Sequence, residues 1–139
     1  MQLFPSPSQI AGQALPRAIV AVALGGAFGA SGRWAVGSTY DITPGAWPWP
    51  TLIVNIVGCL LIGGAARRLR PGSLQWNGIV TGLLGGFTTM STFAVELNEM
   101  ADLDRTGTAV AYGAVTLAAG AVALGLGLAF TPSPGQRST

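Results

Sequence analysis

The sequence sets a few amide, hydroxyl and aromatic side chains inside long apolar runs, where each needs a partner or a ligand. Asn55 lies in the apolar run 52–58, and its carboxamide offers two N–H donors. Residues 85–93 set hydroxyl groups and aromatic rings around a glycine pair. Tyr112 and Thr116 are four residues apart and therefore share one face of a helix. The first, second and fourth apolar runs contain no acidic side chain, so these donors favour an anion as ligand.

Each of these polar residues also has a structural interpretation. Asn55 is equally well explained by a hydrogen bond between helices, and Thr116 by one to the backbone of its own helix. Arg33 is the one fixed charge well inside an apolar run. Its guanidinium either reaches the outer interface beside Trp34 and Tyr40 or pairs with a buried acid or anion.

The composition indicates an integral membrane protein. Half of the 139 residues are hydrophobic, and seven basic and five acidic residues give a net charge of only +2. A mean hydropathy of +0.53 and the lack of histidine and lysine exclude a soluble domain, a nucleic-acid binder and a His-ligated metal enzyme. Cys59 is the only cysteine, so it forms no intrachain disulfide, and we expect a small packing residue.

Four apolar runs are long enough to cross a bilayer, which predicts an all-α fold with transmembrane helices at about 18–39, 51–66, 74–100 and 109–130. They form one membrane domain, 18–130, between tails at 1–17 and 131–139. The third run is longer than a crossing requires. Its glycines and β-branched residues lower helix propensity near the middle, which predicts a break there. At membrane depth the carbonyls freed by a break must be buried or hold an ion.

Arginines in the short loops predict the orientation in the cell membrane. One side has five of them and the other side has one, and the five are Arg17, Arg67, Arg68, Arg70 and Arg137. Both termini are therefore expected in the cytoplasm. Four acids then face outward, and we expect them to belong to a solvated turn: Glu96, Glu99, Asp102 and Asp104.

Three motifs in order along the chain resemble the small fluoride channels of the Fluc or CrcB family. They are Gly-Gly-Ala-Phe-Gly-Ala at 25–30 with Arg33 after it, Thr-Leu-Ile-Val-Asn-Ile-Val-Gly at 51–58, and Gly-Gly-Phe-Thr-Thr-Met-Ser-Thr-Phe at 85–93. The resemblance covers the chain except its two tails. It implies a non-enzymatic channel for passive fluoride export, built as an antiparallel dimer of four-helix subunits with two pores and a structural sodium ion on the dimer axis.

The resemblance also implies roles for single residues. Asn55 would donate a hydrogen bond to fluoride, Phe93 would present its ring edge, and Tyr112 and Thr116 would form a polar track. The sodium ion would bind backbone carbonyls, those of Gly85 and Thr88.

Two residues depart from the family pattern. Met90 stands in the pore motif where the family usually has Phe, and a thioether lacks the electropositive edge of a ring. Gly120 stands one turn after Thr116, so the polar track is thinner. Both departures predict a weaker pore in this subunit.

Two other functions and two kinds of partner are compatible with four short spans. A small multidrug transporter needs an acid in its first helix, and residues 18–39 contain none. A non-conducting scaffold would use the recurring glycines for packing but leaves Asn55 unexplained.

The five-to-one arginine bias favours pairing with an oppositely oriented paralogue, and the alternative is a dimer of identical subunits.

Overall fold

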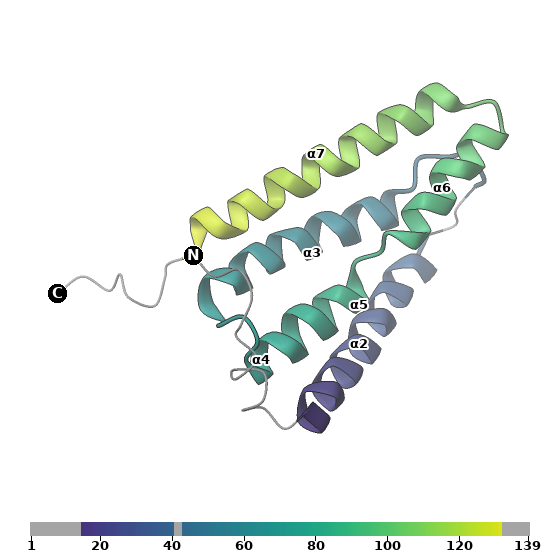
Figure 1. The fold of residues 1–139 in the computed structure, drawn as a ribbon. Coiled ribbons are helices and arrows are strands. Elements are labelled where there is room, and N and C mark those ends of the chain that lie inside the picture. The colour runs from purple at the N-terminus through teal and green to yellow at the C-terminus, as the bar shows by residue number, and fades with distance from the viewer. Residues whose placement is uncertain (1–14, 41–42, 132–139) are drawn as a thin grey trace.

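The computed structural model describes residues 15–40 and 43–131, so most of both predicted tails lies outside the described residues. Within these residues all regular structure is helical, and four spans are long and apolar enough to cross a membrane (Figure 1). The predicted all-α class with four spans is therefore confirmed.

The first, second and fourth spans are single helices, α2 (Leu15–Ser38), α3 (Trp49–Arg68) and α7 (Thr106–Phe130). The third span is divided into α4 (Leu74–Trp76), the π-helix η1 (Asn77–Leu84), α5 (Gly85–Phe87) and α6 (Ser91–Asp102). Helix α3 begins two residues before the predicted start. Its Pro50 lies in the first turn, where a missing N–H costs no helical hydrogen bond.

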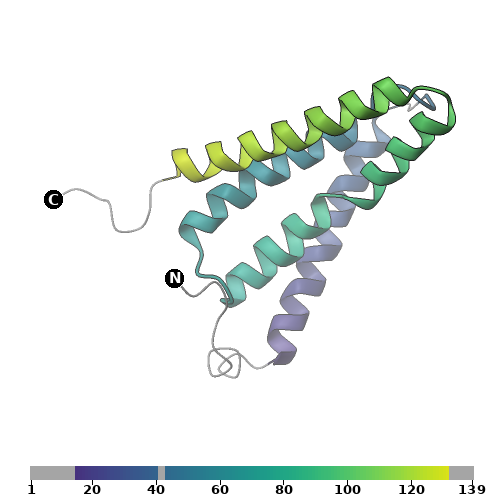
Figure 2. The same cartoon turned by 45° about the horizontal axis from the view of Figure 1, so that its top comes forward.

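The third span is interrupted between α5 and α6, as predicted. Thr88 has extended backbone angles, with φ −71° and ψ 156°, and helical structure resumes only at Ser91. The chain therefore changes direction inside the span, and α6 leaves the line of α5 (Figures 1 and 2).

The spans pack as two pairs that diverge toward one end of the molecule. α2 runs along η1 and α5, whereas α3 runs along α7, and α6 joins the pairs by packing against α7 (Figure 2). Glycines allow the close approach within each pair. A Cβ on Gly29 would overlap the Leu83 carbonyl, and one on Gly127 would overlap the Leu60 carbonyl. This is the packing expected where lipid provides no hydrophobic drive between helices.

Candidate functional site

Asn55 on α3 binds the backbone of the break through both ends of its carboxamide. Its Nδ2 donates to the Thr89 carbonyl at 3.0 Å, and its Oδ1 accepts from the Thr89 N–H at 2.9 Å. Asn55 therefore forms a structural hydrogen bond, as one interpretation of the sequence expected, but its partner is the backbone of the break and not another helix. Only one of the two Nδ2 hydrogens is used by this contact, so the other remains for a ligand.

A cavity of about 330 Å³, here called the central cavity, lies beside this contact. Polar groups from three spans line it, together with one aromatic ring: Asn55, Cys59, Thr88, Thr89, Thr116 and Phe93. No charged side chain of the described residues is part of its lining. The cavity therefore offers amide and hydroxyl groups and a ring in surroundings without fixed charge.

Four of the five predicted pore residues lie on the central cavity, namely Asn55, Met90, Phe93 and Thr116. Phe93 is 4% exposed and Thr116 is 6% exposed, whereas Met90 is 70% exposed in the single subunit. The Thr116 hydroxyl is buried and forms no hydrogen bond with the described residues. An unpaired hydroxyl is costly in an apolar interior, which makes Thr116 a candidate ligand group.

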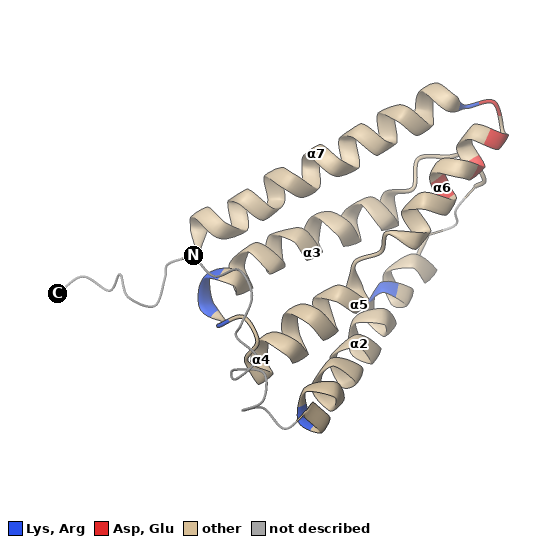
Figure 3. Cartoon of the chain, viewed as in Figure 1, with Lys and Arg blue, Asp and Glu red and all other residues tan. Residues whose placement is uncertain are grey.

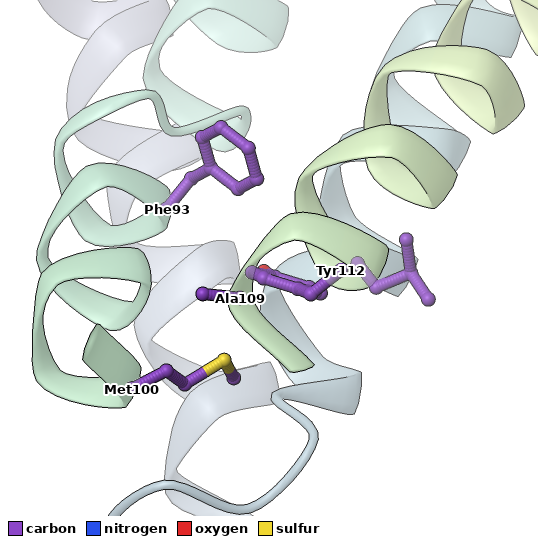
Figure 4. Packing of buried hydrophobic residues seen from close by; sticks show 5 residues of the cluster. Phe93, Met100, Ala109 and Tyr112 are labelled. Atoms are coloured by element: carbon purple, nitrogen blue, oxygen red, sulfur yellow. The ribbon is translucent and has the colours of Figure 1, made fainter. Parts of the chain in front are cut away.

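Tyr112 lies in the core between α6 and α7 and does not line the central cavity. It is fully buried, with its ring 5.3 Å from that of Phe93 and 5.4 Å from that of Trp47, measured between centroids. Figure 4 shows Phe93 and Met100 of α6 pointing toward this part of α7. The Tyr112 hydroxyl donates to Glu96 Oε2 at 2.8 Å.

Glu96 corrects one expectation from the sequence. It was expected in a solvated acidic turn, but it is 8% exposed and lies between α3 and α7. Thr51 Oγ1 donates to its Oε1 at 2.5 Å, and Tyr112 donates to its Oε2. The other three acids near the α6–α7 turn are exposed, as expected. Glu96 differs from the other three acids only because it lies on the side of α6 that faces α3 and α7.

A second cavity, about 550 Å³ and here called the Arg33 cavity, also borders the break. Glu96, Thr51 and Arg33 line it, and Thr89 lines both cavities. Arg33 is half-buried, and its Nε donates to the Gly86 carbonyl at 3.2 Å. Arg33 therefore contacts the backbone of α5, a partner that neither sequence interpretation named.

The two predicted sodium ligands lie where the break removes helical donors. The amide four residues after Gly85 is that of Thr89, which donates to Asn55. The amide four residues after Thr88 is that of Thr92, which donates to the Thr89 hydroxyl at 3.1 Å. Both carbonyls thus lose the donors that a continuous helix would supply, and a hard cation that binds carbonyl oxygens fits them.

Charges separate along the molecule in the described residues. Arg67, Arg68 and Arg70 lie where the helix pairs diverge, and the acids lie at the opposite end with Arg105 (Figure 3). Arg105 donates to the Gly45 carbonyl at 2.5 Å and so links the two loops of the acidic end.

Fold and site together define a multi-pass membrane protein with an uncharged polar cavity beside a broken helix. The family model described as CrcB-like protein, Camphor Resistance (CrcB), matches residues 20–128. A relative from Bordetella petrii named "Fluoride-specific ion channel FluC" is 42% identical over 119 residues, covering 83% of this chain and 91% of its own length. A relative from Mycobacterium bovis named "Fluoride-specific ion channel FluC 1" is 40% identical over 114 residues, covering 79% and 86%. The chain belongs to the CrcB family, as its motifs predicted.

Proposed function

We propose that this chain is a subunit of a fluoride-selective channel that exports fluoride passively across the cell membrane. The observation that carries the proposal is the central cavity, which polar side chains and the Phe93 ring line without a fixed charge. Two relatives in the same family are named as fluoride-specific ion channels. Lower cytoplasmic fluoride is the expected benefit to the cell.

The chemistry of the cavity suits a small anion that holds its water tightly. The free Nδ2 hydrogen of Asn55, the Thr116 hydroxyl and the positive edge of Phe93 replace water around the ion. Conduction also requires weak binding, and the absence of an arginine from this lining prevents a deep electrostatic trap. Met90 lies at the uncovered rim of the same cavity. Its thioether attracts an anion less strongly than the positive edge of an aromatic ring would. Tyr112 contributes to the site indirectly, because it donates a hydrogen bond to Glu96 and packs against the ring of Phe93.

A structural sodium ion is part of the proposal. Bound by the Gly85 and Thr88 carbonyls, it would neutralise the oxygens that the break frees and hold two subunits together at that point. Two features support this: the donors to both carbonyls are engaged elsewhere, and Gly85 is exposed in a single subunit.

The second subunit is proposed to lie antiparallel to this one. The two helix pairs diverge and leave broad apolar faces uncovered, so one subunit provides only part of a protein interior. In this proposal the arginines at one end favour the orientation with both termini in the cytoplasm. An oppositely oriented paralogue is therefore the proposed partner, and a second copy of this chain is the alternative.

Fluoride efflux from liposomes tests the function. Purified protein, reconstituted together with its oppositely oriented partner subunit in vesicles loaded with potassium fluoride, should release fluoride on addition of valinomycin, and vesicles loaded with potassium chloride should release almost no chloride. Proton-coupled export of a cationic drug without fluoride flux would instead indicate a small multidrug transporter. Absence of both would indicate a scaffold.

Expression of this gene alone tests the partner. Accessibility labelling of both termini should find one topology, and fluoride resistance should require the oppositely oriented paralogue. Mixed topology together with full resistance from this gene alone would favour the homodimer.

A further inference from the structure

The single cysteine lines the central cavity and is therefore more than a packing residue. Cys59 follows Asn55 by one helical turn on α3, so both side chains face the same way, and both line the cavity. Its thiol is half-buried. The cavity lining therefore continues from the carboxamide of Asn55 to the sulfur of Cys59.

The sulfur lies opposite the place where α7 lacks a side chain. Gly120 follows Thr116 by one turn, and a Cβ placed on Gly120 would be 3.4 Å from Cys59 Sγ. That distance is an ordinary van der Waals contact. The thiol thus reaches the position into which a side chain at residue 120 would project.

A second and independent observation indicates that this region binds a ligand. Thr116 is 6% exposed and lines the same cavity, and its buried hydroxyl has no hydrogen-bond partner among the described residues. The hydroxyl one turn earlier on its helix, that of Tyr112, already donates to Glu96. A ligand in the cavity would satisfy Thr116 and would lie within reach of Cys59.

We propose that Cys59 is a further lining residue of the fluoride path, in which its S–H group takes the place of the hydroxyl that Gly120 cannot supply. This inference rests on the proposed channel function. It predicts that the path is closed by small thiol reagents, because a group added to Cys59 Sγ occupies the cavity. An S–H group is a weak donor, so its contribution to flux is smaller than that of Asn55.

The test uses methyl methanethiosulfonate on the channel in liposomes, with no second cysteine in this chain to react. The deprotonated Cys59 sulfur attacks the methylthio sulfur of the reagent, forming Sγ–S–CH₃ and releasing methanesulfinate, while the thiol proton goes to buffer. Mass spectrometry measures the added methylthio group, and dithiothreitol removes it. We expect a loss of fluoride flux of about tenfold or more that reverses on reduction.

Four variants complete the test, and the last of them is a matched control. Cys59→Ser should resist the reagent, since its hydroxyl cannot form the mixed disulfide. Cys59→Ala should lower flux, and Cys59→Ala/Gly120→Ser should recover it by restoring a hydroxyl from α7. The matched control, Cys59→Ser/Val122→Cys, sets a cysteine on an exposed position of α7 and should keep its flux after labelling.

The proposal is wrong if complete labelling of Cys59 leaves fluoride flux unchanged, or if the reagent never reaches the thiol in a conducting channel. These outcomes are distinct from failure of the proposed function. If the proposed channel function fails, the untreated parental protein will conduct no fluoride, with or without its partner subunit.

Discussion

Replacing Asn55 by Asp is the most informative perturbation of the site. Asp keeps an oxygen that accepts from the Thr89 N–H but loses the donor to the Thr89 carbonyl. The carboxylate then faces that carbonyl oxygen at about hydrogen-bond distance and also brings a negative charge into the central cavity. Asn55→Ala removes both hydrogen bonds without adding a charge, so the two variants separate the structural effect from the electrostatic one.

The size of each effect follows from the geometry. Loss of both hydrogen bonds in Asn55→Ala should lower the free energy of unfolding by about 2 kcal/mol, at about 1 kcal/mol per bond. A carboxylate about 4 Å from a passing anion opposes it by about 4 kcal/mol at an effective dielectric constant of about 20. That energy corresponds to about a thousandfold loss of fluoride flux, since about 1.4 kcal/mol is tenfold.

The assay compares fluoride efflux and thermal unfolding in detergent for the parent, Asn55→Ala and Asn55→Asp. Asn98→Asp is the matched control, because it makes the same chemical change at an exposed residue of α6 that bonds Asp102. Its flux should stay within about twofold of the parental rate, since exposed charges are screened. An Asn55→Asp channel that passes fluoride at the parental rate would refute the place of Asn55 on the path.

Three further predictions concern packing and the sodium ion. Tyr112→Phe removes one of the two donors to Glu96 and should lower the free energy of unfolding by about 1 to 3 kcal/mol, whereas the exposed control Tyr40→Phe should leave thermal unfolding unchanged. Gly29→Ala forces a methyl group into the contact between α2 and η1 and should lower the free energy of unfolding by about 3 kcal/mol. Gly37→Ala is the control and should be tolerated, because no atom lies within 4 Å of its Cβ. Thermal unfolding in detergent compares the two variants, and equal melting temperatures would contradict the packing. Exhaustive removal of sodium, with no other small cation supplied, should abolish fluoride flux and shift the dimer toward monomer in light scattering, and unchanged flux and mass would exclude a structural sodium ion.

The broken third span illustrates how far the sequence alone predicts the fold. A glycine pair followed by β-branched residues disfavours a helix wherever it stands, because the cause is local to the backbone and its own side chains. The helix interruption after Phe87 was predictable for that reason. The same holds for the four spans, since span length is set by bilayer thickness.

Side-chain partners were harder to predict. Tyr112 and Thr116 share a helix face by spacing, yet the first bonds Glu96 on α6 and the second faces the central cavity. A helix face is broad enough to meet two neighbours, and spacing along one helix does not identify them. The motif resemblance identified Asn55 as a residue of the fluoride path. It did not predict the two hydrogen bonds between Asn55 and Thr89, because these residues are 34 positions apart in the sequence.

The sequence by itself determined the class of protein, the four spans, the break and the residue types proposed to bind an anion. These depend on composition and on local backbone energetics, which each segment has by itself. Only the tertiary structure decided that Glu96 is buried while its acidic neighbours are exposed, and that Cys59 lies opposite Gly120. Both depend on which helices pack together and at what rotation, because that arrangement alone determines which atoms from distant positions meet.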